Sequence, residues 1–120
     1  MTEQMLRQYT VLVEYLGKTL GPDYEVVLHE ILPENSRVAA IANGSISGRS
    51  VGAPITNAAL RMIMQKQYET SDYNLNYTGQ LANGKTIRSS TMFIKDGGKL
   101  VGLLCINFDD SRFHEISDAI

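Results

Sequence analysis

The chain has 120 residues, the size of one domain, and its composition of 43% hydrophobic and 20% charged residues is that of a folded protein rather than a disordered one. The net charge is −2 and no basic cluster occurs, so we expect no direct nucleic-acid binding by this segment. The single Cys105 excludes an internal disulfide, and without a signal peptide or an apolar run of ~18 residues we expect a cytoplasmic protein that does not enter a membrane.

An amphipathic helix is predicted from Thr2 to about Leu20, with Thr2 near its N-cap and Gly21-Pro22 ending it. Apolar side chains recur in it every three or four residues, at Met5, Leu6, Tyr9, Leu12, Val13, Leu16 and Leu20. This stripe is larger than one face of a small sheet needs. We therefore expect part of it to pair with a second chain, giving a homodimer through the N-terminal helix.

Two strands are predicted next, at Tyr24–Ile31 and Arg37–Ala42. The first is rich in β-branched and aromatic residues, and the turn around Pro33 is short, so the two strands form a hairpin. The segment Asn43–Gly52 holds three glycines and three serines and is predicted to be a loop. It separates the hairpin from the second half of the chain.

A second helix is predicted from about Ile55 to Tyr68, with Pro54 at its start. A third strand is predicted at Tyr73–Leu81, where the aromatic and apolar residues at 73, 75 and 77 alternate with polar ones. Asn83-Gly84 is a strong hairpin signal after it.

The segment Arg88–Asp109 predicts two apolar strands joined by a turn at Asp96-Gly97-Gly98, because glycine accepts the positive φ of tight turns. Such long apolar runs are typical of strands covered on both faces. Five strands joined mostly by short turns must be largely antiparallel. The fold class is therefore α+β, with one five-stranded antiparallel sheet and an N-terminal helix.

Residues 110–120 predict the first turns of a helix, with Phe113, Ile116 and Ile120 on one face. No capping residue ends it, so we expect this helix to continue beyond the sequence as a linker. The chain contains no internal repeat and no linker between domains. We therefore expect residues 1–120 to form one domain.

No catalytic or metal site is recognisable in the sequence. His29, His114 and Cys105 lack the spacing of zinc ligands, and no base accompanies Ser89 or Thr91 to make a nucleophile. Cys105 lies between apolar neighbours and is predicted to be an inert core residue. We expect no enzyme activity, no metal and no cofactor.

The loop Gly44–Ser50 resembles a phosphate cradle but is one residue short of the Walker spacing and has Arg49 in place of Lys. Nucleotide binding is therefore not assigned. Its backbone amides and the Arg49 guanidinium could bind a carboxylate through two hydrogen bonds. The simpler alternative is a loop whose serines satisfy its own backbone.

Polar side chains of several strands are expected to meet on one side of the sheet. If the first and fifth strands are neighbours, strand alternation places His29 and Asn107 on the same covered face. The candidate ligand-binding residues are His29, Asn43, Ser47, Arg49, Ser89, Thr91 and Asn107. Because an unpaired buried polar group costs about 1–3 kcal/mol, these residues either bind a ligand or form an internal hydrogen-bond network. The sequence leaves both alternatives open.

Several runs of sequence resemble, in order, the YheO-like PAS domain; they are GPDYEVVLHEI, AAIANGSISGR, VGAPIT, and RSSTMFI with GLLCINFD. The resemblance extends from about Leu20 to Asp109. It implies a PAS fold, a five-stranded antiparallel sheet with helices across one face. In that family the domain precedes a C-terminal helix-turn-helix in bacterial transcriptional regulators, and no such motif lies within these 120 residues.

The resemblance implies a sensory domain of a cytoplasmic bacterial transcriptional regulator. Such a domain would bind a small polar metabolite, or mediate dimerisation, and pass its state through its terminal helices by a population shift. The alternative is a structural dimerisation module without a ligand. The two differ in whether the polar groups face a cavity or are satisfied internally.

Overall fold

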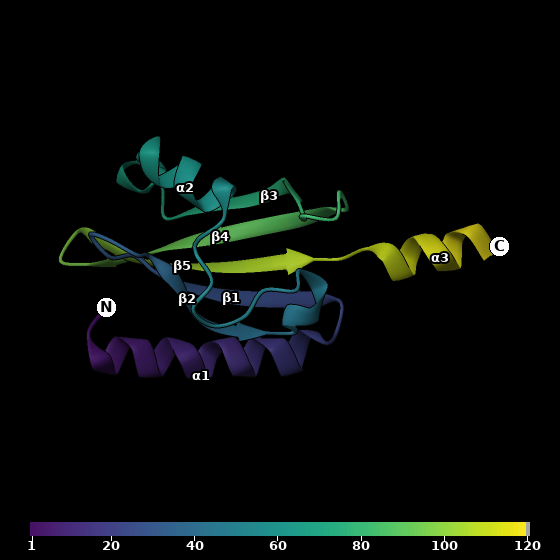
Figure 1. Ribbon diagram of the computed structural model, residues 1–120, viewed down its shortest axis with the longest axis horizontal. Helices are drawn as coiled ribbons and strands as arrows, with labels where there is room; N and C mark the ends of the chain where they lie inside the picture. The colour runs from purple at the N-terminus through teal and green to yellow at the C-terminus, as the bar shows by residue number, and fades with distance from the viewer. Residues whose placement is uncertain (120) are drawn as a thin grey trace.

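The computed structural model describes residues 1–119. Its elements in chain order are α1 (Glu3–Leu20), β1 (Tyr24–Glu30), β2 (Arg37–Ala42), the 3-10 turn η1 (Gly44–Ile46), α2 (Asn57–Met64), the 3-10 turn η2 (Gln67–Glu69), β3 (Tyr73–Gln80), β4 (Thr86–Asp96), β5 (Lys99–Phe108) and α3 (Ser111–Ala119). The five strands form one antiparallel sheet in the order β2-β1-β5-β4-β3 (Figure 1). The predicted α+β class and all five predicted strands are confirmed.

The sheet separates two apolar clusters. On one face, α1 runs along the sheet and packs mainly on β1 and β2 (Figure 1). On the other face, α2 supplies Ala59 and Met62 to a cluster with side chains of β1, β2, β4 and β5. Alternation along β1 divides its residues between the faces, so that Val26 and Leu28 contact α1, while Val27 lies in the α2 cluster.

Helix α1 begins and ends where the sequence predicts. The Thr2 hydroxyl accepts a hydrogen bond from the Met5 N–H at 3.1 Å and caps the first turn, and Gly21 follows the last turn with a φ of 93°. A Cβ at position 17 would overlap the side chain of Ala42, so Gly17 allows α1 to approach β2 closely. The helix therefore lies directly on the hairpin of β1 and β2.

The apolar stripe of α1 is used inside the chain. Met5, Tyr9, Leu12 and Leu16 all pack, partly buried, against the cluster on this face. The large apolar side chains that α1 leaves most exposed lie elsewhere on the helix, at Val11 and Tyr15, which are 61% and 60% exposed. The stripe therefore covers the sheet, and the most exposed large apolar side chains of α1 lie outside it.

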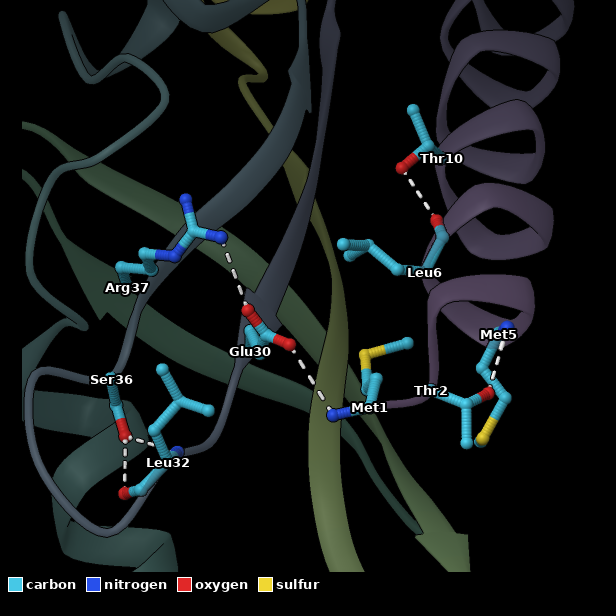
Figure 2. Close-up of polar contacts among 9 residues, drawn as sticks. All are labelled: Met1, Thr2, Met5, Leu6, Thr10, Glu30, Leu32, Ser36 and Arg37. Carbon is cyan, nitrogen blue, oxygen red and sulfur yellow. Dashed lines mark hydrogen bonds and ion pairs between the residues drawn. The ribbon is translucent and has the colours of Figure 1, made fainter.

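An ion-pair cluster joins the start of α1 to the far end of the β1–β2 hairpin (Figure 2). Glu30 accepts from the α-amino group of Met1 at 3.3 Å and from the guanidinium of Arg37 at 3.2 Å, one bond to each carboxylate oxygen. In the adjoining turn, the Ser36 hydroxyl bonds both the N–H and the C=O of Leu32. The polar groups at this end of the face therefore have partners within the chain.

The second helix is shorter than predicted. It spans Asn57–Met64, because the Thr56 hydroxyl accepts a hydrogen bond from the Ala59 N–H at 3.1 Å and fixes the start there. Pro54 does not open the helix; it pairs with Arg37 in an isolated bridge beside β2. Lys66 has a left-handed backbone conformation, with a φ of 55°, and separates α2 from η2. The placement of Pro54 at the helix start is therefore wrong.

The C-terminal helix α3 extends away from the end of the sheet (Figure 1). It is held at its start by the ring of Phe113, whose centroid lies 5.8 Å from that of Phe108, and by Arg112, which lies 3.4 Å from the Asp23 carboxylate. Phe113 and Ile116 are about three-fifths exposed, and Ile120, predicted on the same face, lies outside the described residues. Within residues 1–119, no helix is long and apolar enough to span a membrane.

Candidate functional site

A cavity of about 430 Å³ lies on the α2 face of the sheet. Its walls come from four strands, from the loop after β2 and from the segment that leads into α2. The polar side chains that line it are Glu25, His29, Ser47, Arg49, Thr56, Asn57, Tyr77, Gln80, Ser89 and Asn107. Its size is within the range of ~300–1,000 Å³ that small-molecule sites occupy.

Strand register aligns four of these side chains in a row across the sheet. Glu25 of β1 is the register partner of Asn107 of β5, Asn107 is the partner of Ser89 of β4, and Ser89 is the partner of Tyr77 of β3. Directly paired residues point to the same face. His29 lies four residues after Glu25 on β1 and lines the same cavity, so His29 and Asn107 do share a face.

Glu25 joins the loop to the sheet. It is 1% exposed, and its carboxylate accepts from the Ser47 hydroxyl at 2.5 Å and from the Asn107 amide at 2.9 Å. The Ser47 oxygen in turn accepts from the backbone N–H of Arg49 at 3.1 Å. The candidate residues Ser47 and Asn107 are therefore brought together by a carboxylate that the sequence analysis did not select.

His29 is buried without a hydrogen bond at Nδ1. The side chain is 2% exposed, and among the described residues this nitrogen has no partner. Burial, followed by the nearby charge of Arg49, lowers the pKa of His29 from 6.5 to about 4. The imidazole is therefore neutral near pH 7, with one ring nitrogen that donates and one that accepts.

Arg49 lines the same cavity and has nitrogens without a hydrogen-bond partner among the described residues. Its Nε and Nη2 are buried, and neither has a hydrogen-bond partner within the described part of the chain. These two nitrogens lie on one edge of the planar guanidinium, the edge that forms two parallel hydrogen bonds with a carboxylate. The loop thus holds a cation beside a neutral imidazole.

Thr91 is behind the cavity wall rather than on it. Its hydroxyl is 2.7 Å from the Tyr77 hydroxyl and 3.3 Å from the Cys105 sulfur, and the residue is 1% exposed. Burial raises the pKa of the Cys105 thiol to about 11 and that of the Tyr77 hydroxyl to about 12, so both stay protonated near neutral pH. Among the described residues, no group of three or more His, Cys, Asp or Glu side chains is arranged to hold a metal ion.

Asn43 is placed outside the cavity. Its amide nitrogen donates to the carbonyls of Gly17, Gly21 and Tyr24 at 3.2, 3.0 and 2.7 Å. Asn43 therefore joins the last turn of α1 to the residue that follows it and to the first residue of β1. Its side chain therefore stabilises the fold, which sequence patterns did not reveal because these partners are distant in the chain.

Tyr77 reaches the cavity through an irregularity in β3. The β3–β4 register shifts between Asn74 and Tyr77, and Asn76 has a φ of 55°. Tyr73 is consequently 57% exposed, whereas Tyr77 is half-buried in the cavity. The predicted regular alternation of β3 is wrong at this point, because a bulge moves residues after it to the opposite face.

Comparisons with known proteins agree with this architecture. The family described as YheO-like PAS domain matches residues 1–120. "Uncharacterized protein YheO" of Escherichia coli K12 is 33% identical over 114 residues, which cover 93% of this chain and 48% of that protein. A Haemophilus influenzae protein is 30% identical over 108 residues, covering 89% of this chain and 48% of its own.

The chain therefore spans about half the length of the curated relatives it matches. Among solved structures, the PAS domain of a Colwellia psychrerythraea protein aligns with a TM-score of 0.52 at 19% identity. The alignment covers 88% of this chain and 96% of that domain. At this identity the likeness concerns the fold alone.

Proposed function

Because the chain belongs to the YheO-like PAS family, we propose that it is the sensory domain of a cytoplasmic bacterial transcriptional regulator and binds a small polar metabolite in the cavity on the α2 face. The observation that carries this proposal is the set of buried, unpaired atoms at one cavity, Nδ1 of His29 with Nε and Nη2 of Arg49. A ligand with hydrogen-bonding groups can pair with these atoms.

The cavity is connected to the C-terminal helix through adjacent residues. Glu25 and Asn107 bond each other in the cavity. Tyr24 directly precedes Glu25, Phe108 directly follows Asn107, and the rings of Tyr24 and Phe108 lie 4.7 Å apart. Phe108 also contacts Phe113 of α3. A ligand that favours one arrangement of the Glu25–Asn107 pair therefore shifts the position of α3, provided that it binds the two arrangements with different affinities.

Dimerisation through α1 is the second candidate function. Val11 and Tyr15 lie one turn apart on this helix and are 61% and 60% exposed, so together they form an apolar surface that a second chain can cover. A ligand-free dimerisation module would use this surface and would satisfy the cavity residues internally. Light scattering of the purified chain and of a Val11→Glu, Tyr15→Glu variant tests it, and a wild-type monomer at high micromolar concentration contradicts it.

A thermal-shift screen of amino acids, organic acids and nucleobases against the purified chain tests the sensory proposal. We expect at least one class of compound to raise the melting temperature of the wild type. The same compound is expected to have no effect on a His29→Met variant, whose side chain fills a similar volume but offers no ring nitrogen. A screen in which no compound stabilises the wild type contradicts the proposal.

A further inference from the structure

Arg49 carries a positive charge and takes part in none of the ion pairs among the described residues. Glu25, whose carboxylate lines the same cavity, is already bonded at both carboxylate oxygens, by Ser47 and by Asn107. The loop therefore holds the guanidinium at the cavity with its two-bond edge unused.

Resting on the proposed function, we infer that the ligand carries a carboxylate group and that this group is bound by Nε and Nη2 of Arg49, with His29 beside it. A carboxylate matches the spacing and the plane of these two N–H groups, and it supplies a negative charge to pair with the positive guanidinium. His29 contributes a ring nitrogen for a further hydrogen bond to the same ligand.

The charged groups that line the cavity favour a ligand group with one negative charge over a group with two. A phosphate group carries about −1.5 to −2 at pH 7 and would meet only one guanidinium. His29 adds no second positive charge, because its lowered pKa of about 4 keeps it neutral. The Glu25 carboxylate lines the same cavity and repels a dianion more than it repels a monoanion.

The other residues that line the cavity indicate what the rest of the ligand is like. Val27, Ile55 and Ile87 supply apolar wall, and Ser89 and Tyr77 supply hydroxyl groups. This mixture suits a small carboxylic acid whose remaining part is largely apolar and carries at most a few hydrogen-bonding groups.

Matched pairs of acid and primary amide separate the carboxylate from the rest of the ligand. Lactate with lactamide, benzoate with benzamide, and each further acid that stabilises the wild type with its own amide are titrated into the purified chain by calorimetry. We expect an acid to bind and its amide to bind at least tenfold more weakly, because the hydrogen bonds to a charged group are lost.

Three variants assign the effect to Arg49. Arg49→Gln is expected to abolish binding of the acid, and Arg49→Lys to weaken it about ten- to hundredfold, because the charge remains without the two-bond edge. Arg61→Gln removes an exposed arginine of α2 and is expected to bind the acid like the wild type. In the wild type, the Arg49 Nε–H resonance, assigned through its covalent bonds, is expected to move when the acid is added.

The outcomes distinguish this inference from the proposal on which it rests. Equal binding of acid and amide, an unchanged response of Arg49→Gln, or a stationary Arg49 Nε–H resonance overturns the carboxylate inference and leaves a sensory cavity for another ligand. Failure of every screened compound, neutral or charged, to stabilise the wild type overturns both. The Arg49 Nε–H resonance of the wild type tests the carboxylate inference even where the Arg49 variants do not fold.

Discussion

Glu30 and His29 are neighbours on β1, yet their side chains face opposite sides of the sheet and differ in their hydrogen-bond partners. Glu30, on the α1 side, is 7% exposed and bonds Met1 with one oxygen and Arg37 with the other (Figure 2). His29, on the cavity side, is 2% exposed, and its Nδ1 has no partner among the described residues.

The same contrast holds for the loop after β2. Asn43 donates to three carbonyls between the last turn of α1 and the start of β1, whereas Arg49, six residues later, leaves Nε and Nη2 unpaired within the described residues. Unpaired buried polar atoms lower stability and are uncommon in folded proteins. The polar groups of the α1 face and of Asn43 therefore have partners within the chain, whereas His29 and Arg49 on the cavity side keep atoms without a partner among the described residues.

The largest effect is expected where the cavity face does contribute to stability. Glu25→Ala removes two hydrogen bonds to a buried carboxylate and leaves Ser47 and Asn107 without their acceptor. We expect a loss of about 3 kcal/mol in the free energy of unfolding, measured by urea denaturation. Glu34→Ala, at an exposed turn, is the control and should change it by less than about 0.5 kcal/mol. Equal effects of the two substitutions would show that Glu25 does not hold the loop.

A pH effect is expected from His29. Its pKa is lowered to about 4 in the folded chain, by burial first and by Arg49 second, and is near 6.5 when unfolded. Between these values the unfolded chain binds more protons, so the contribution to stability is complete above about pH 6.5 and is lost as the pH falls toward 4.

Between pH 7.5 and pH 5 the free energy of unfolding is expected to fall by about 2 kcal/mol more for the wild type than for His29→Met. The variant has no group that titrates at this position. Urea denaturation at several pH values measures the difference. Parallel stability curves for the two proteins would rule out a buried neutral imidazole.

A smaller effect is expected on the α1 face. Glu30→Gln keeps the shape of the side chain but removes its charge beside Met1 and Arg37, and we expect a loss of about 1 kcal/mol. Glu14→Gln is the matched control, because Glu14 and its partner Lys18 are both largely exposed, and it should cost less than about 0.5 kcal/mol. Thermal unfolding of both variants measures the difference, and a larger loss for Glu14→Gln would contradict this account of the Glu30 cluster.

Alternation along strands predicted which face His29 and Asn107 share, because a period of two needs only neighbouring strands to place them together. The same rule puts Glu25 on that face, and the signal was present in its spacing from His29. It was not recognised because a strand carboxylate is usually exposed, and the partner that permits its burial, Asn107, is 82 positions away.

The remaining differences arise from contacts that local sequence does not encode. Asn43 lies in a loop typical of ligand binding, but its partners come from α1 and from the start of β1. Tyr77 depends on the bulge in β3, and Pro54 depends on its pairing with Arg37. In each case tertiary structure decided between two local conformations that the sequence pattern allows.

The most direct test of the contrast between the two faces compares His29→Met with Asn43→Ala. For each variant we would measure the free energy of unfolding at pH 7.5 and the thermal shift caused by the compound that most stabilises the wild type. We expect His29→Met to be within about 0.5 kcal/mol of the wild type and to lose the shift, and Asn43→Ala to lose about 2 kcal/mol and to keep it. A His29→Met variant that loses as much stability as Asn43→Ala and keeps the full shift would contradict the account, since His29 would then belong to an internal network.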